Sequence, residues 1–323
     1  MIDIEALGNA VLRGKEITHE EALALYAAPL EPLAKKADEI RARFCGNAFD
    51  LCAILNAKSG RCPENCKFCA QSARYATGAE EYPLLRTEEI VHAAKIHAVQ
   101  GVLRYSLVTS GRRLTDDEVE KICEAARTIR QETNLSVCVS CGLLNEAQFR
   151  ALKEAGISRA HNNLETSRRN FPNICTTHTF EDKIAAIRAA QAAGLTVCSG
   201  GLMGLGETPQ DRVDMALTLR VLGIKSVPLN LLHPIPGTPL AAASPLSAEE
   251  LRRIVAIYRF LLPDAAIRLA GGRSQLPDRG RSCFVSGANA AISGGMLTTA
   301  GVTVQTDRNL LKELGYEVRP IEA

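Results

Sequence analysis

Three closely spaced cysteines are the residues of this sequence best suited to carry chemistry. Cys62, Cys66 and Cys69 form a C-x3-C-x2-C pattern in the segment CPENCKFC. Three thiolates on one short loop can hold three irons of a cubane cluster, which leaves the fourth iron without a protein ligand. An open iron of this kind can bind the amino and carboxylate groups of a methionine moiety. We therefore predict a 4Fe–4S cluster on this loop.

A structural zinc site, or thiols without a role, is the alternative for the same cysteines. Structural zinc takes four protein ligands, and no further Cys or His lies close to this loop in the sequence. Phe68, next to the last cysteine, is an aromatic residue that can pack against an adenine ring. The pattern therefore favours the cluster over zinc.

The composition is that of a globular protein that can bury a full core. The 323 residues are 46% apolar and 23% charged, with a net charge of +2 and interspersed signs, so we expect no nucleic-acid partner. No run of about 18 apolar residues predicts a membrane span, and the N-terminus lacks the layout of a signal peptide. Eleven cysteines, an odd number in a long chain, favour metal binding or catalysis in a reducing compartment. We expect a cytoplasmic protein.

Short apolar runs alternate with amphipathic helical patterns from residue 54 onward, which is typical of βαβ units and a parallel sheet. Helices are predicted at roughly 87–100, 116–133, 145–155, 179–193, 208–222 and 247–262. Strands are predicted at Ala53–Lys58, Val102–Val108, Leu135–Ser140, Arg159–Asn163, Thr196–Gly200, Ser226–Leu231, Ala266–Leu269 and Asn289–Ile292. Eight strands favour an α/β fold, a (β/α)8 TIM-type barrel, over an open doubly wound sheet. Residues 1–50 are expected to form an N-terminal helical extension and residues 51–323 a single barrel domain.

The sequence around the cysteines resembles the radical S-adenosylmethionine superfamily and, within it, the biotin synthase family, along most of residues 15–320. The resemblance lies in residues 57–72 (AKSGRCPENCKFCAQS), 161–166 (HNNLET), 197–207 (VCSGGLMGLGE) and 287–289 (GAN). It implies a (β/α)8 barrel, sulfur insertion into dethiobiotin to form biotin, a homodimer, and a flavodoxin or ferredoxin as reductant. It also implies that S-adenosylmethionine is cleaved to methionine and a 5′-deoxyadenosyl radical, twice per product.

No side chain is expected to act as a catalyst in this chemistry. An unactivated C–H bond has no acidic proton for an acid–base residue to remove, so a cofactor must carry the hard step. The protein then binds, orients and excludes water.

The resemblance also implies which residues bind the small molecules. Asn163 and Glu165, at the end of the fourth predicted strand, would contact S-adenosylmethionine, and Asn163 would also touch dethiobiotin; a polar turn capping the strand is the alternative. The family more often has aspartate at the position of Glu165. Phe68 and the turn with Gly204 and Glu207 would lie at the adenine. Asn230 is a candidate for the ureido ring, with a hydrogen-bonded core asparagine as the alternative.

A second, auxiliary cluster is implied as the sulfur donor, and here the sequence departs from the family pattern. The best-known members hold a 2Fe–2S cluster on three barrel cysteines and an arginine. Two of these cysteines match Cys138 and Cys198, and the arginine matches Arg268. The third falls on Ser106, a poor iron ligand because its hydroxyl resists deprotonation.

Two other cysteines stand where the family has aliphatic residues, Cys141 and Cys175. We therefore predict that Cys138, Cys141, Cys175 and Cys198 hold a four-iron auxiliary cluster, with an additional iron-bound sulfide as sulfur donor and Arg268 beside it. Small buried apolar cysteines are the alternative for Cys141 and Cys175.

The remaining cysteines receive no functional role: Cys123 is expected in the core, and Cys45, Cys52 and Cys283 have no partner at a suitable spacing. Two rival functions stay open. One is another radical S-adenosylmethionine enzyme acting on a different small molecule, such as a maturase that assembles a metal cofactor. The other is an iron–sulfur carrier, which has no use for an open iron.

Overall fold

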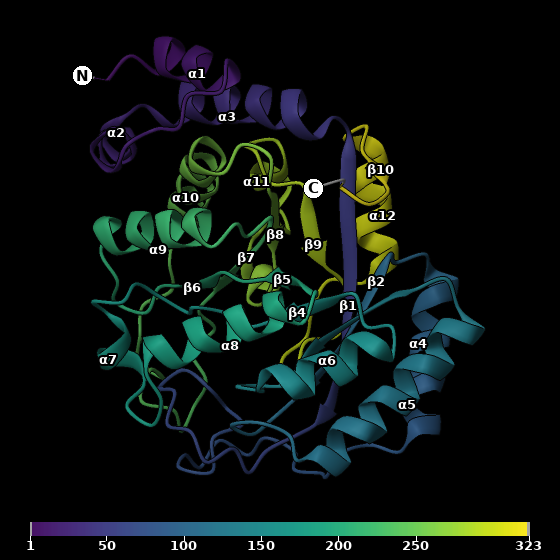
Figure 1. Cartoon of the computed structure of the whole chain (residues 1–323). Coiled ribbons are helices and arrows are strands. Elements are labelled where there is room, and N and C mark those ends of the chain that lie inside the picture. The colour runs from purple at the N-terminus through teal and green to yellow at the C-terminus, as the bar shows by residue number, and fades with distance from the viewer. Residues whose placement is uncertain (1, 322–323) are drawn as a thin grey trace.

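The barrel predicted from the sequence is present in the computed structural model, which describes residues 2–321; the outermost residues of the two predicted regions, 1 and 322–323, lie outside this range. Eight parallel strands form a ring surrounded by helices (Figure 1). In order they are β1 (Ala48–Lys58), β2 (Arg104–Thr109), β3 (Ser136–Ser140), β4 (Arg159–His161), β5 (Thr196–Cys198), β7 (Ser226–Leu231), β8 (Ala266–Leu269) and β9 (Ala290–Ile292). Pairing of β1 with β9 closes the ring. The (β/α)8 barrel is therefore confirmed and the open sheet is excluded.

Two short strands extend the sheet beyond the ring. β6 (Gly201–Met203) follows β5 directly and pairs with β7 above the point where β5 ends. β10 (Glu317–Val318) pairs with the first residues of β1, so the last described segment of the chain lies against the start of the barrel.

Helices follow the strands and bury one face against the barrel. They are α4 (Thr87–Gln100), α5 (Asp116–Glu132), α6 (Glu146–Glu154), α7 (Phe171–Ile174), α8 (Phe180–Ala192), α9 (Pro209–Val221), α10 (Ala248–Leu261), η2 (Arg273–Gln275), α11 (Arg281–Phe284) and α12 (Val304–Glu313). The start of α5 is a capping box: the Thr115 hydroxyl accepts from the Glu118 N–H and the Glu118 carboxylate accepts from the Thr115 N–H. The inner face of α5 carries Cys123, which is fully buried, in agreement with its expected place in the core.

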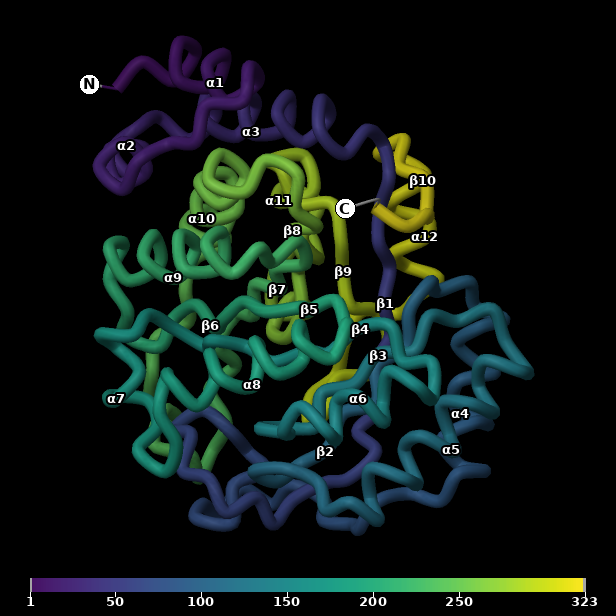
Figure 2. Tube along the Cα trace, viewed as in Figure 1, coloured from purple at the N-terminus to yellow at the C-terminus, as the bar shows by residue number. Residues whose placement is uncertain are grey.

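The helices before the barrel lie at the end opposite to the cysteine loop. They are α1 (Ile4–Leu12), α2 (His19–Ala24), η1 (Leu25–Ala27) and α3 (Leu30–Cys45), and α3 packs along α10. Figure 2 shows these helices at one end of the molecule and the segment that follows β1 at the other. The C-terminal ends of the strands, where TIM barrels carry their sites, therefore face away from them.

The first strand is longer than predicted. β1 begins at Ala48 rather than Ala53, and it pairs with β9 from Asp50 to Cys52. Side chains alternate between the two faces of a strand, so the extra residues place Asp50 and Cys52 on the same face as Ile54, which points into the barrel. Within residues 2–321, no helix is both long enough and apolar enough to cross a bilayer.

Candidate active site

The C-terminal ends of the barrel strands surround a cavity of about 340 Å³. It gathers seven of the residues predicted from the sequence: Phe68, Cys138, Asn163, Glu165, Cys198, Asn230 and Arg268. Its wall also contains Cys52, Ser106, Arg159 and His161. Cys141, Cys175, Gly204 and Glu207 are not part of the wall. The cavity thus joins the cysteine loop, through Phe68, to thiols deeper in the barrel.

The loop with Cys62, Cys66 and Cys69 is folded by its own backbone. The Cys62 N–H donates to the Gln71 carbonyl at 3.0 Å, and the Ala73 N–H donates to the Cys62 carbonyl at 2.8 Å. The Cys69 N–H donates to the Cys66 carbonyl at 3.0 Å, which makes a tight turn between the last two cysteines. All three thiols are free and partly exposed.

The donor chemistry of this loop fits an iron–sulfur cluster. Burial raises the pKa of Cys69 to about 11, and a hydrogen bond with Cys175 together with burial raises the pKa of Cys66. Without a metal these thiols are neutral, whereas bound iron would hold them as thiolates. Three soft ligands beside an open cavity suit a cluster with one iron left free for a ligand.

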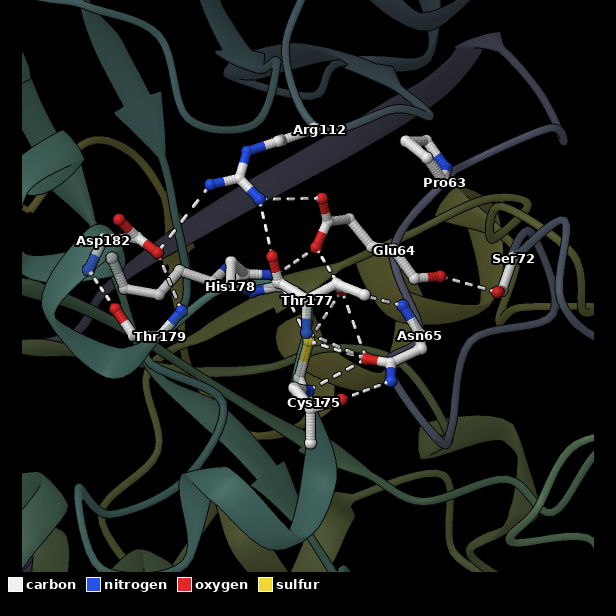
Figure 3. Close-up of polar contacts among 12 residues, drawn as sticks. Pro63, Glu64, Asn65, Ser72, Arg112, Cys175, Thr177, His178, Thr179 and Asp182 are labelled. Atoms are coloured by element: carbon white, nitrogen blue, oxygen red, sulfur yellow. Dashed lines mark hydrogen bonds and ion pairs between the residues drawn. The ribbon is translucent and has the colours of Figure 1, made fainter.

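Cys175 lies against this loop and not in the barrel (Figure 3). Its sulfur is 3.3 Å from Asn65 Oδ1 and 3.2 Å from His178 Nδ1. The ligand atoms of Cys66, Cys175 and His178 all lie within 4.8 Å of one another. The hydrogen bond with Cys66 lowers the pKa of Cys175 to about 3, against the effect of burial.

The buried carboxylate of Glu64 completes this cluster of polar groups, as Figure 3 shows. Glu64 Oε2 is 2.5 Å from His178 Nδ1, and Glu64 Oε1 accepts from Arg112 at 3.3 Å. The Arg112 guanidinium also donates to the Thr177 carbonyl at 2.6 Å. These contacts bind the segment after α7, which contains Thr177 and His178, to the cysteine loop. The two segments together fix the position of Cys66.

Cys141 faces away from the cavity, into the core between strands and helices. Burial raises its pKa to about 12. It follows Cys138 by three residues, and an odd separation in extended chain places two side chains on opposite faces. The structure therefore does not bring together the four thiols of the predicted auxiliary set: Cys138 and Cys198 share the cavity, whereas Cys141 and Cys175 lie elsewhere.

Cys52 is the thiol that the sequence reasoning left without a role. It lines the cavity together with Cys138 on β3 and Cys198 on β5. Burial raises the pKa of Cys52 and of Cys138. Burial also acts to raise the pKa of Cys198, but a hydrogen bond with His161 and nearby arginines outweigh it and bring that pKa to about 6. The signal that could have found Cys52 was its even spacing from Ile54 on one strand.

Arginines surround the thiols at the floor of the barrel. Arg268 donates to Asp50 Oδ1 at 3.0 Å and Arg104 donates to Asp50 Oδ2 at 2.9 Å. Arg159 donates to the Ser226 hydroxyl at 3.4 Å. Despite burial, the charges of Arg268, Arg104 and Arg159 hold the pKa of the Asp50 carboxyl well below its usual range. Three guanidiniums and one carboxylate give this floor a net positive charge.

Asn163 and Glu165 lie together on the cavity wall. Asn163 accepts from the Gly200 N–H at 3.1 Å and its amide donates to Glu165 Oε2 at 3.4 Å. Glu165 has a φ of 68°, in the left-handed region, and hydrogen bonds with Gly200 and Leu202 on both sides of its backbone hold it there. A Cβ on Gly201 would lie 2.5 Å from the Glu165 carbonyl, so this contact requires glycine.

The side chains of Glu207 and Asn230 form hydrogen bonds with backbone groups. Glu207 accepts from the Gly204 N–H at 2.9 Å, from Leu205 at 2.6 Å and from Arg212 at 2.9 Å, so its carboxylate holds the glycine-rich turn from inside. Asn230 donates to the Gly201 carbonyl at 3.1 Å and accepts from the Gly271 N–H at 2.9 Å. Asn230 still lines the cavity, with one amide hydrogen and one lone pair left over.

Comparison with known proteins places the chain in a family. The model of the radical SAM superfamily matches residues 57–219, and that of the Biotin and Thiamin Synthesis associated domain matches residues 228–317. The biotin synthase of Akkermansia muciniphila is 56% identical over 314 residues, 97% of this chain and 98% of its own length. Biotin synthase 2 of Corynebacterium diphtheriae is 57% identical over 316 residues, 98% and 96% of the two chains. The chain belongs to the biotin synthase family.

Membership in the biotin synthase family makes the protein a radical S-adenosylmethionine sulfurtransferase, with a 4Fe–4S cluster and S-adenosylmethionine as cofactors. Solved structures share its fold. A methylornithine synthase matches with a TM-score of 0.85 at 21% identity over 97% of both chains. A maturase of the [FeFe]-hydrogenase matches with a TM-score of 0.83 at 19% identity, over 97% of this chain and 74% of its own. At these identities the likeness concerns the fold alone.

Proposed function

We propose that this enzyme converts dethiobiotin to biotin, with a cluster on Cys62, Cys66 and Cys69 at the mouth of the barrel and an auxiliary iron–sulfur cluster at its floor as sulfur donor. The observation that carries the proposal is the cavity that extends from Phe68, beside the last cysteine of the loop, to Cys138 and Cys198. A substrate in this cavity lies between a source of radicals and a source of sulfur. Relatives named biotin synthase that match almost the whole chain support this substrate.

The side chains of the cavity wall have binding and orienting roles in this proposal. When bound, the cluster and S-adenosylmethionine supply a carbon radical that removes hydrogen from unactivated carbons. Phe68 packs against the adenine, while Asn163 and Glu165 offer an amide and a carboxylate to S-adenosylmethionine. The free hydrogen-bonding capacity of Asn163 and Asn230 suits the ureido ring of dethiobiotin. Gly204 and Glu207 do not line the cavity; they act indirectly, by fixing the conformation of the turn after β6.

For the auxiliary site we propose a four-iron cluster that carries an additional sulfide, the atom transferred to the substrate. Two observations support this choice. Ser106 stands where the common two-iron site has a cysteine, and its hydroxyl is a poor iron ligand. The excess of arginines over carboxylates at the barrel floor favours an anionic, sulfide-rich group.

The remaining parts of the proposal rest on the resemblance to the family. A flavodoxin or ferredoxin would supply the electrons, and the enzyme would act as a homodimer in the cytoplasm. Size-exclusion chromatography with light scattering tests the dimer, and replacing dithionite by each reductant in the assay tests the electron donor.

The decisive experiment follows dethiobiotin and S-adenosylmethionine in the anaerobically reconstituted enzyme with dithionite as reductant. We expect biotin together with 5′-deoxyadenosine, and neither product from the Cys62→Ala variant. Formation of 5′-deoxyadenosine without biotin would contradict the substrate and indicate a relative that acts on another small molecule. If S-adenosylmethionine is not cleaved at all, an iron–sulfur carrier becomes the better interpretation.

A further inference from the structure

We infer that Cys52 is the third thiolate ligand of the auxiliary cluster, so that Cys52, Cys138 and Cys198 hold it and Cys141 and Cys175 do not. The inference rests on the proposed function and assigns the protein side of its sulfur donor. It starts from the place of the three thiols, which line one cavity from three strands of the barrel, β1, β3 and β5.

The three thiols are close enough to influence one another. In addition to burial, an ionised Cys138 raises the pKa of Cys52, and an ionised Cys198 raises that of Cys138. Neither Cys52 nor Cys138 is bonded to a carbonyl or hydroxyl at short range: Cys52 is 3.6 Å from Asp50 Oδ1, and Cys138 is 4.0 Å from the Ser136 carbonyl. The sulfurs of Cys52 and Cys138 thus form no strong hydrogen bond within the protein that iron binding would have to break.

Ser106 explains why a cysteine on the neighbouring strand is needed. It lies on β2, level with Cys138 on β3, and it lines the same cavity. Its hydroxyl would remain protonated beside iron far more readily than a thiol. Cys52 lies on β1, the strand on the other side of β2, where it pairs with Arg104, two residues before Ser106. It supplies a thiol to the wall of the same cavity.

The charges at this level of the barrel favour an anionic occupant. Against the larger effect of burial, the charge of Arg159 acts to lower the pKa of both Cys52 and Cys138. Arg268 has the same effect on Cys52, and Arg104 has it on Cys138. Asp50 is the carboxylate that faces these arginines, and it is held by two of them. Three guanidiniums against one carboxylate compensate the negative charge of thiolates and inorganic sulfide.

The surroundings of Cys141 and Cys175, the other two cysteines of the set predicted from the sequence, argue against a role as ligands of the auxiliary cluster. Cys141 lies in the apolar core outside the cavity, and Cys175 contacts Asn65 and His178 beside Cys66. Three cysteines for four irons leave one iron without a thiolate. That position is free for the additional sulfide of the proposed donor, and His161 and Arg268 line the cavity beside Cys198.

The test uses the full chain with Cys62, Cys66 and Cys69 changed to Ala, so that only the auxiliary site can hold iron after anaerobic reconstitution. Adding Cys52→Ser should remove most of the bound iron and sulfide and the Mössbauer signal of the cluster. Serine is nearly isosteric with cysteine and can hydrogen-bond to Asp50, so the fold, followed by circular dichroism, should persist. Ser106→Ala, Cys141→Ala and Cys175→Ala are the matched controls and should each retain iron.

A second measurement needs no change at Cys52. In the same triple-Ala background, anaerobic crystals of the reconstituted protein should show anomalous iron density next to the Cys52 sulfur and none next to the sulfurs of Cys141 and Cys175. Full iron content in Cys52→Ser, or iron density that is not in contact with the Cys52 sulfur, would overturn the assignment. These readouts need no dethiobiotin, so they test the ligand assignment independently of the proposed function. The proposed function is tested only by conversion of dethiobiotin with the unmodified enzyme.

Discussion

Arg268 donates to both the backbone carbonyl and the carboxylate of Asp50, at 2.9 and 3.0 Å. Both side chains are almost completely buried, and Arg104 occupies the other carboxylate oxygen. The stability that depends on such a pair is mostly the penalty for leaving one partner alone in the interior. Arg268 on β8 is therefore fixed beside the thiols of the barrel floor by a residue of β1, two strands away across β9.

Asp50→Asn tests this arrangement, because it removes the charge and keeps the shape. We expect the free energy of unfolding to fall by about 3–5 kcal/mol, since the buried Arg268 and the partly buried Arg104 lose their counter-charge. Urea unfolding of the cluster-loaded enzyme under anaerobic conditions measures it. Asp264→Asn is the control: its partner Lys225 and Asp264 itself are about half exposed, so the loss there should be under about 1 kcal/mol. Equal losses in the two variants would contradict the prediction.

Gly201→Ala tests how Glu165 is held. The new Cβ would meet the Glu165 carbonyl and Met215 Sδ, each at 2.5 Å, and overpacking of this kind costs about 1–3 kcal/mol. We expect lower stability and weaker binding of S-adenosylmethionine, measured by equilibrium dialysis against the cluster-loaded enzyme. A Cβ on Gly295 meets nothing within 4 Å, so Gly295→Ala should leave both quantities unchanged. Unchanged affinity in Gly201→Ala would show that Glu165 does not contribute to this binding.

The barrel could be predicted because its signals are local. Strand and helix patterns alternate at a regular period, and a capping box such as that of Thr115 and Glu118 marks the start of a helix within a few residues. The spacing of Cys62, Cys66 and Cys69 is local as well. None of these signals depends on which distant segment lies alongside.

The auxiliary site could not be predicted in the same way, because the face on which a cysteine points depends on strand bounds and tertiary partners. The predicted strand began at Ala53, and Cys52 received no role because no cysteine lies at a suitable spacing from it in the sequence. In the structure Arg104 and Arg268, distant in sequence, neutralise Asp50 and allow β1 to start at Ala48. The neighbours of Cys175 could not be predicted from the sequence for a similar reason, because it contacts Asn65, 110 residues away.

Cys175→Ala distinguishes two roles for Cys175: a ligand of the auxiliary cluster, as the sequence predicted, or a neighbour of Cys66 at the cysteine loop. Without iron, Cys66 is the donor in its hydrogen bond with Cys175. Iron bound to Cys66 would replace its proton, so a protonated Cys175 would then donate to the cluster thiolate, and such bonds raise the reduction potential of the cluster. A net contribution of about 0.5–1.5 kcal/mol corresponds to roughly 20–60 mV. We expect full iron content and a potential lower by this amount in an EPR-monitored redox titration, with Cys175→Ser closer to the unmodified enzyme. Loss of auxiliary iron would instead restore Cys175 to that site.

Asp211, at the start of α9, gives a prediction for the dependence of stability on pH. Burial acts to raise its pKa, but hydrogen bonds from Ser167, Thr208 and Arg169 outweigh burial and lower the pKa from 3.8 to about 2. The folded state thus binds its proton less readily than the unfolded state. The stabilisation is fully present above about pH 4 and is lost as the pH falls toward 2.

Asp211→Asn should therefore lower the free energy of unfolding by about 1–3 kcal/mol at pH 7, where buried hydrogen-bond donors lose a charged acceptor. The difference from the unmodified enzyme should stay constant down to about pH 4 and narrow below it. Denaturation series run in parallel at pH 7, 5, 4 and 3 measure it, and effects common to both proteins, including acid loss of clusters, cancel in the difference. Asp117→Asn, exposed in the first turn of α5, should change stability by less than about 1 kcal/mol. A difference between Asp211→Asn and the unmodified enzyme that widens as the medium becomes more acidic would show that the Asp211 pKa is raised and not lowered.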